Sequence, residues 1–122
     1  MFNRFYPDED VASAYDIPYD ALYREGVRGV IFDVDNTLVP HDAPADERAK
    51  NLFSHLRALG MDTCLLSNNK EPRVAAFAEA VGGSNYIYKG GKPGVKNYKK
   101  AMELMGTGLQ STIFVGDQLF TD

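Results

Sequence analysis

Short apolar runs alternate along the chain with longer stretches in which apolar residues recur every three or four positions. Unbroken apolar runs are typical of strands buried in a parallel sheet, whereas the three-four spacing predicts amphipathic helices. The pattern predicts strands at 29–32, 63–66, 86–88 and 112–115, and helices that begin at Pro18 and run over 44–59, 72–81 and 95–105. Strands and helices therefore alternate, which indicates an α/β fold with a parallel sheet.

The ends of the predicted helix at 44–59 carry their own signals. Pro44 suits a first helical turn, and Gly60 suits a C-terminal cap. Asp46 favours the positive end of the helix dipole. We interpret residues 1–17, which are aromatic and acidic, as an N-terminal lead-in, and residues 18–122 as the core of one domain.

Composition narrows the classes of protein. The chain has 122 residues, of which 44% are hydrophobic and 25% charged, as in a packed globular domain. The net charge of −4 gives no electrostatic support for a nucleic-acid partner. The single cysteine, Cys64, excludes an internal disulfide and is interpreted as a buried thiol. No apolar run approaches the roughly 18 residues of a membrane span, so we expect a cytoplasmic protein.

Polar clusters follow each predicted strand. Asp33, Asp35 and Thr37 come after the first strand, 67–69 after the second, Lys92 after the third, and Gly116 with Asp117 after the fourth. Open α/β sheets bind ligands beyond the carboxyl ends of their strands. Each cluster alone is also compatible with a simple turn, but their shared placement predicts one site.

The residue types fit phosphoryl transfer. Neighbouring carboxylates such as Asp33 and Asp35 repel each other, and a hard cation such as Mg²⁺ relieves this repulsion. One carboxylate can attack phosphorus, and the other can protonate the leaving alkoxide. Lys92 and the Ser67 hydroxyl can balance the charge on the phosphoryl oxygens.

The motif order D-x-D-x-T, S-N, K-P and G-D-x-x-x-x-D resembles the haloacid-dehalogenase (HAD) superfamily of phosphatases. The segments IFDVDNTLV, LLSNN, GKP and GDQLFTD are most similar to its YqeG-like branch, which is related to the phosphatidylglycerophosphate phosphatases. The resemblance implies a Rossmann-like, three-layer α/β/α fold. The segments 38–43 and 89–91 are too short for inserted domains, so the enzyme is expected to be capless.

The resemblance also implies a role for each matching residue in a Mg²⁺-dependent phosphatase that forms an aspartyl-phosphate. Asp33 is the expected nucleophile and a metal ligand. Asp35 is the expected general acid/base, and its backbone carbonyl is a second metal ligand. Thr37 braces the loop, while Ser67 and Asn68 bind the phosphoryl group.

Three further roles fall in the last third of the chain. Lys92 is expected to bind the phosphoryl group and to neutralise its charge in catalysis. Asp117 is the expected third metal ligand, and Asp122 a supporting acid that lies near the metal or orients Lys92.

The substrate expected from the resemblance is a phosphorylated small molecule or a lipid headgroup, with phosphatidylglycerophosphate as the leading candidate. A basic stretch beside the crevice is either a solvated helix face or a surface for peripheral contact with the inner face of the membrane; its members are Lys89, Lys92, Lys96, Lys99 and Lys100. Two other functions stay open. One is a receiver-like phosphoacceptor module, and the other is a non-catalytic scaffold that binds a partner.

The sequence stops at Asp122, within the last motif. A complete fold of this superfamily continues into another strand and helix, so we expect a truncated core. The strand at 112–115 is then expected to lack a neighbour on one side. Such an exposed edge favours pairing between two copies as a homodimer.

Overall fold

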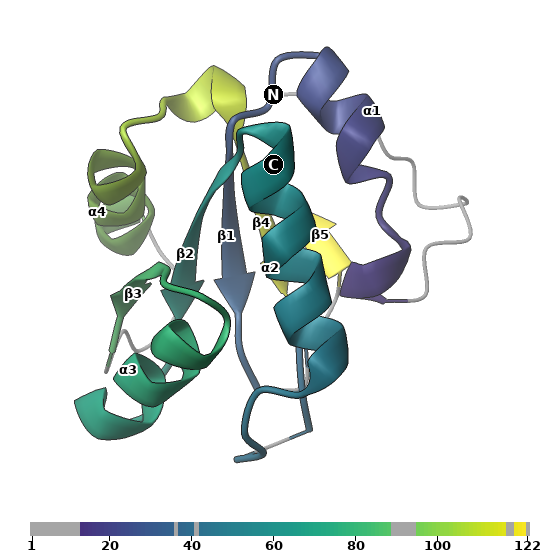
Figure 1. The fold of residues 1–122 in the computed structure, drawn as a ribbon. Coiled ribbons are helices and arrows are strands. Elements are labelled where there is room, and N and C mark those ends of the chain that lie inside the picture. The colour runs from purple at the N-terminus through teal and green to yellow at the C-terminus, as the bar shows by residue number, and fades with distance from the viewer. Residues whose placement is uncertain (1–12, 36, 41, 89–94, 117–118, 122) are drawn as a thin grey trace.

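A computed structural model describes residues 13–35, 37–40, 42–88, 95–116 and 119–121 (Figure 1). Its helices are α1 (Tyr19–Arg24), α2 (Glu47–Leu59), α3 (Glu71–Ala80) and α4 (Val95–Met105), with 3-10 turns at Ala14–Asp16 and Leu109–Ser111. Its strands are β1 (Gly29–Asp33), β2 (Asp62–Leu66), β3 (Asn85–Ile87), β4 (Thr112–Gly116) and β5 (Leu119–Thr121). Every strand and helix predicted from the apolar pattern is confirmed.

The sheet has the strand order β3-β2-β1-β4-β5, and the first four of these strands run parallel. β1 lies at its centre, between β2 and β4. Val30 and Phe32 of β1 pack into the larger hydrophobic cluster, whereas Ile31 packs into the smaller one on the opposite face. Burial on both faces explains why this strand is uniformly apolar.

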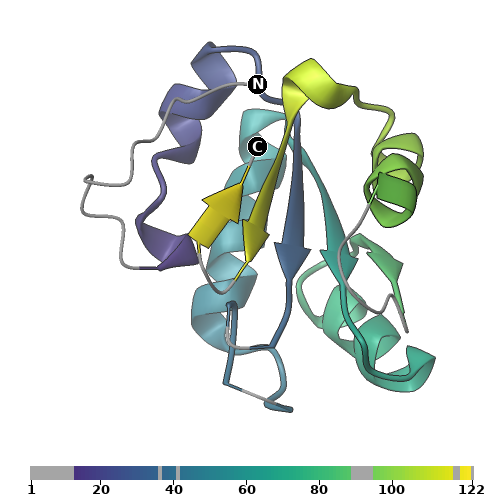
Figure 2. The same ribbon diagram turned by 180° about the vertical axis from the view of Figure 1, so that it is seen from behind.

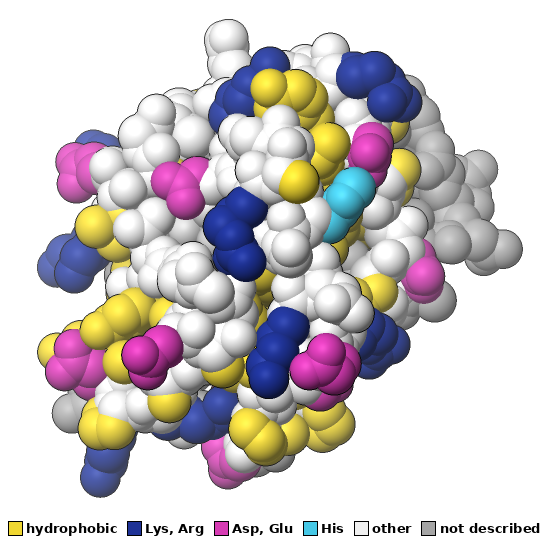
Figure 3. All heavy atoms as spheres, in the orientation of Figure 1, with side chains coloured by type: hydrophobic (Ala, Val, Ile, Leu, Met, Phe, Trp, Pro, Cys, Tyr) yellow, Lys and Arg dark blue, Asp and Glu magenta, His cyan; other side chains and the backbone are white. Residues whose placement is uncertain are grey.

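The molecule has three layers. The larger cluster joins α1, α2 and α3 to one face of the sheet, and the smaller cluster joins α4 to the other. Figures 1 and 2 show α2 in front of the sheet from one side and behind it from the other. On the α2 side, basic and acidic side chains are interspersed rather than gathered by sign (Figure 3). The expected three-layer α/β/α architecture is confirmed.

The start of α2 differs from the prediction. The helix begins at Glu47, and Asp46 is its N-cap, with its side chain accepting a 2.9 Å hydrogen bond from the Ala49 N–H. Pro44 therefore precedes the helix instead of occupying its first turn. A side-chain acceptor satisfies an otherwise unpaired helix N–H, which proline at N1 does not do. The predicted end is confirmed, because Gly60 caps α2 in the left-handed conformation at φ 99°.

The prediction that β4 lacks a neighbour on one side is wrong. β5 pairs with β4 in antiparallel orientation, with Val115 opposite Phe120. Only residues 117–118, which lie outside the described part of the chain, separate the two strands in the sequence. The edge on which the expected homodimer was based is therefore covered within the chain.

Part of the lead-in belongs to the core. Ala14 and Ile17 are buried in the larger cluster, and the Tyr19 hydroxyl donates a 2.7 Å hydrogen bond to the Ala14 carbonyl. Residues 1–12 lie outside the described part of the chain. Within the described ranges, no helix is both long enough and apolar enough to cross a membrane.

Candidate active site

Two of the polar clusters meet at the carboxyl edge of the sheet. Asp33 is the last residue of β1 and stands opposite Leu66, the last residue of β2, so Ser67 begins the neighbouring loop. The Val34 N–H donates to the Leu66 carbonyl at 3.3 Å, and the Ser67 N–H donates to the Ile87 carbonyl at 3.1 Å. These bonds carry the sheet pairing one residue beyond the strands, and they fix the start of both loops.

The loop after β1 folds back on the Val34 carbonyl. This carbonyl accepts from the N–H groups of Thr37 at 3.3 Å and Leu38 at 3.0 Å. Val34 and Leu38 are buried, which anchors the loop to the core. Within the described residues, the Thr37 hydroxyl is buried and has no hydrogen-bond partner.

The lead-in supports this loop from the side. The Tyr15 hydroxyl donates a 2.6 Å hydrogen bond to the Leu38 carbonyl, and the Arg48 guanidinium lies 4.0 Å from the centre of the Tyr15 ring. Burial, reinforced by the charge of Asp46, raises the pKa of Tyr15 to about 12. Tyr15 therefore remains a neutral donor at physiological pH.

The Asp35 carboxylate is held by three nitrogen donors. Its Oδ1 accepts from the Asp42 backbone N–H at 2.8 Å and from Arg73 Nη2 at 3.0 Å, and its Oδ2 accepts from Asn69 Nδ2 at 2.8 Å. In all three contacts the carboxylate oxygens of Asp35 accept and an N–H group donates. Sequence reasoning did not predict the roles of Arg73, Asn69 or Asp42.

Asn69 also joins Asp35 to the predicted phosphate-binding residue Ser67. The Ser67 hydroxyl oxygen accepts from the Asn69 backbone N–H at 3.1 Å. Ser67 is 5% exposed, whereas Asn68 is exposed at the surface of the loop. The structure thus brings Asp35, Ser67 and Asn69 into one hydrogen-bonded group.

Three of the predicted site residues, Lys92, Asp117 and Asp122, lie outside the described residues. Asp117 follows Gly116, which ends β4 beside β1. Among the described ranges, no group of three or more His, Cys, Asp or Glu side chains is placed to hold a metal ion. Asp33, the carbonyl of Asp35 and Ser67 nevertheless offer only oxygen, which is the ligand type that Mg²⁺ prefers.

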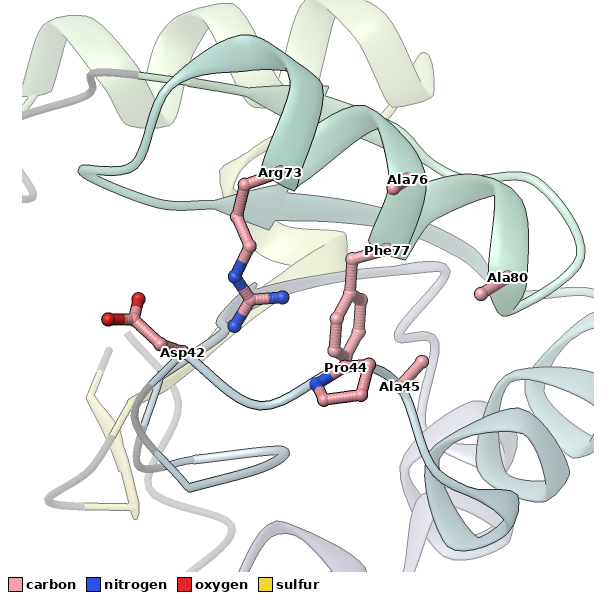
Figure 4. A pocket seen from close by; sticks show the side chains of 7 residues that line it. All are labelled: Asp42, Pro44, Ala45, Arg73, Ala76, Phe77 and Ala80. Atoms are coloured by element: carbon pink, nitrogen blue, oxygen red, sulfur yellow. The ribbon is translucent and has the colours of Figure 1, made fainter.

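A cavity of about 330 Å³ lies between α3 and the segment that leads into α2, and two of its lining residues, Asp42 and Arg73, donate hydrogen bonds to Asp35. Its lining is mainly apolar and comprises Asp42, Pro44, Ala45, Arg73, Ala76, Phe77 and Ala80. Figure 4 shows the Arg73 guanidinium reaching from α3 toward the segment that carries Asp42 and Pro44, next to the Phe77 ring.

Cys64 takes no part in the site. It is 0% exposed within β2, and burial raises the pKa of its thiol to about 12. The interpretation of Cys64 as a buried thiol is confirmed.

Comparison with known proteins agrees with this architecture. The model of the family described as "haloacid dehalogenase-like hydrolase" matches residues 41–122. "Probable phosphatase YqeG" of Bacillus subtilis (strain 168) is 38% identical over 124 residues, covering 100% of this chain and 72% of that protein. "Phosphatidylglycerophosphate phosphatase 1, chloroplastic/mitochondrial" of Arabidopsis thaliana is 29% identical over 116 residues, covering 87% of this chain and 33% of that protein.

Solved structures show the same fold. A Vibrio cholerae protein assigned as a 3-deoxy-D-manno-octulosonate 8-phosphate phosphatase superposes with a TM-score of 0.64 at 17% identity, over 84% of this chain and 62% of that one. The cobalt-bound deoxy-D-mannose-octulosonate 8-phosphate phosphatase of Haemophilus influenzae superposes with a TM-score of 0.59 at 19% identity. The match covers 75% of this chain and 59% of that one. The chain thus spans less than two thirds of these solved structures.

The parallel sheet, the acidic residues at its carboxyl edge and these matches together define a hydrolase of the phosphatase type. The chain belongs to the haloacid dehalogenase-like hydrolase family. Its predicted resemblance to the YqeG-like phosphatases is confirmed.

Proposed function

We propose that the chain hydrolyses a phosphate monoester in a Mg²⁺-dependent reaction, through an aspartyl-phosphate on Asp33. One observation carries this proposal: Asp33, Asp35 and Ser67 lie at the carboxyl edge of two adjacent parallel strands in a haloacid dehalogenase-like fold. This edge is where open α/β sheets bind ligands.

The proposed reaction has two steps. In the first, a carboxylate oxygen of Asp33 attacks phosphorus, the bond to the alcohol oxygen breaks, and Asp35 gives its proton to the departing oxygen. In the second, Asp35 takes a proton from a water molecule as that water attacks the phosphorus. Inorganic phosphate leaves, and the Asp33 carboxylate and the Asp35 acid are restored.

The oxygen atoms near Asp33 that could bind a metal suit a hard cation. All three hydrogen bonds to the Asp35 carboxylate come from nitrogen donors, so its backbone carbonyl is the better candidate for a metal ligand. We propose that Mg²⁺ is held by this carbonyl, the Asp33 carboxylate and Asp117. When bound, Mg²⁺ supplies positive charge that offsets the charge of the phosphoryl group and the carboxylates.

The proposed roles of the remaining site residues follow from their positions. Ser67 would bind a phosphoryl oxygen, with Asn68 beside it and Lys92 supplying positive charge. Thr37 would brace the loop after β1, and Asp122 would support the metal or Lys92. For this group, family membership supports the proposal.

The proposed substrate class is an anionic lipid phosphate, with phosphatidylglycerophosphate as the leading candidate. The name of the Arabidopsis thaliana relative supports this choice. The short connection from β1 to α2 supports an open crevice without a cap domain, which suits a headgroup at a membrane surface. Lys96, Lys99 and Lys100 are exposed on α4 and could add peripheral attraction to anionic lipids, from the cytoplasmic side.

The test begins with p-nitrophenyl phosphate, with and without Mg²⁺. We expect turnover that depends on Mg²⁺ and is abolished in Asp33→Asn. Asp62→Asn is the matched control. Asp62 is an exposed aspartate that begins β2, so it lies at the amino ends of the strands, away from the site. Equal activity in the two variants would refute the role of Asp33, and Mg²⁺ binding without turnover of any ester would favour the scaffold function.

A second measurement addresses the substrate. Release of phosphate is compared between phosphatidylglycerophosphate in vesicles and a set of soluble sugar and nucleotide phosphates. Turnover of a soluble ester with none of the lipid would overturn the lipid assignment and leave the phosphatase proposal intact. A stable phosphoprotein that accumulates without hydrolysis would instead favour the receiver-like function.

A further inference from the structure

Arg73 stands out because it forms a shielded ion pair with the proposed acid/base residue. Its Nη2 lies 3.0 Å from Asp35 Oδ1, and the two side chains are only 22% and 17% exposed. Water screens such a pair less than it screens a surface pair. Removing one partner leaves the other as an uncompensated, largely buried charge, so a change at Arg73 is transmitted to Asp35.

The same arginine is poorly placed for stabilising its own helix. Arg73 lies in the first turn of α3, where the positive end of the helix dipole disfavours a cation by about 0.3–1 kcal/mol. Within the described residues, its Nε is buried and has no hydrogen-bond partner. A buried donor without a partner carries a desolvation cost. These two unfavourable features point to a role for Arg73 other than the stability of α3.

The contacts of Asp35 show what that role can be. Oδ1 accepts two hydrogen bonds, from the Asp42 N–H and from Arg73, while Oδ2 accepts one, from Asn69. A carboxylate oxygen has about two lone-pair positions, so among the described residues Oδ1 has two donors and Oδ2 has one, which leaves Oδ2 the less occupied oxygen. Arg73 thereby fixes the rotation of the carboxylate and leaves Oδ2 as the oxygen that can carry a proton.

Building on the phosphatase function proposed above, we propose that Arg73 is a positioning residue that orients Asp35 so that Oδ2 exchanges protons with the leaving oxygen and with water. Arg73 acts through Asp35 and makes no contact with the phosphoryl group in this proposal. Misplacement of a catalytic group by about 1 Å can cost about 100-fold in rate, which is the scale of the expected effect.

The cavity beside α3 provides a way to test this role. The guanidinium forms part of the cavity wall, and its Cζ lies 5.7 Å from the centre of the Phe77 ring (Figure 4). Truncating Arg73 to alanine enlarges a space of about 330 Å³ at the place that the guanidinium leaves. A free guanidinium ion from solution can then occupy this place and contact Asp35 Oδ1.

The first experiment compares two esters with the same ring and different leaving groups, phenyl phosphate and p-nitrophenyl phosphate. The value of kcat/KM reports the steps up to release of the phenol, and only the poorer leaving group, phenol, needs proton donation there. In Arg73→Met, which keeps the packing on Phe77, we expect kcat/KM to fall about 100-fold for phenyl phosphate and much less for p-nitrophenyl phosphate. Equal losses for the two esters would overturn the proposal.

The second experiment uses Arg73→Ala and guanidinium chloride at concentrations that leave the melting temperature unchanged. We expect guanidinium to restore kcat/KM for phenyl phosphate, whereas equal concentrations of urea or sodium chloride do not. Arg57→Ala is the matched control, since Arg57 donates a 2.7 Å hydrogen bond to the Val81 carbonyl, outside the site. Absence of rescue, or equal stimulation of the control variant, would overturn the proposal.

Failure of this inference is distinguishable from failure of the proposed function. An unmodified chain that turns over neither ester, or an Asp33→Asn variant that keeps full activity, contradicts the phosphatase mechanism itself. If the chain is active and requires Asp33, but its Arg73 variants lose kcat/KM equally for both esters, only the positioning role is contradicted.

Discussion

Replacing Tyr15 with phenylalanine tests whether the lead-in holds the loop that follows the candidate nucleophile. The change removes a single hydroxyl, which donates a 2.6 Å hydrogen bond to the Leu38 carbonyl. Leu38 is 1% exposed, so water cannot easily replace this donor. An unsatisfied buried acceptor costs about 1–3 kcal/mol, and we expect the free energy of unfolding to fall by about 1–2 kcal/mol.

The assay is thermal or urea unfolding followed by circular dichroism. A loss of this size lowers the melting temperature of a chain of this length by roughly 3–10 °C. Tyr88→Phe is the matched control, because Tyr88 is 43% exposed and lies outside the core, and we expect no measurable change there. Equal stability of Tyr15→Phe and the unmodified chain would refute the reasoning that this hydroxyl anchors the loop.

The pH dependence of stability gives a second measurement on the same pair of proteins. The pKa of Tyr15 is raised from 10.0 to about 12 in the folded chain, first by burial and then by the charge of Asp46. Between these two values the unfolded chain loses the tyrosine proton while the folded chain retains it, so stability falls as the pH rises. We expect a shallower fall in Tyr15→Phe than in the unmodified chain above pH 10. A difference of the opposite sign would contradict the assigned direction of the shift.

Three further predictions concern helix capping, the core and the thiol. Asp46→Ala removes the acceptor of the Ala49 N–H and should lower the free energy of unfolding by about 1 kcal/mol in urea titrations, whereas no change would argue against the cap. Phe53→Ala opens a cavity beside Phe32, whose ring centre lies 5.1 Å away, and should cost about 3–5 kcal/mol by the same measurement. Cys64 should resist a thiol reagent at pH 8 until the chain is unfolded, because burial raises its pKa to about 12; rapid labelling of the folded chain would contradict this.

The strands and their polar ends were predictable because both faces of the sheet are covered. Burial is most complete in β1, in residues 63–66 of β2 and in Ile113 and Val115 of β4, and the apolar run of each strand stops at its carboxyl end. The carboxylates and hydroxyl that follow are polar residues at fixed places in this pattern. Asp33 and Ser67 were therefore predicted to lie together, and the register of β1 on β2 places them so.

Other features depend on contacts that leave no periodic signal. β5 is a short strand, Leu119–Thr121, and sequence reasoning took its residues as part of a motif, so the antiparallel neighbour of β4 was missed. Arg73 lies beside apolar positions of α3, where a single charge resembles ordinary helix surface. Arg73 is 38 positions from Asp35 in the sequence, and the hydrogen bond between them forms only because α3 packs beside the loop after β1.

Asn69 shows that a position in the site can be restricted by polarity rather than by size. Its amide donates to Asp35 Oδ2 at 2.8 Å while its backbone N–H donates to Ser67. An aspartate there would have nearly the same shape but would set one carboxylate against another at hydrogen-bond distance. Deamidation of Asn69 would introduce the same charge without any mutation, because it replaces the amide that donates to Asp35 with a second carboxylate.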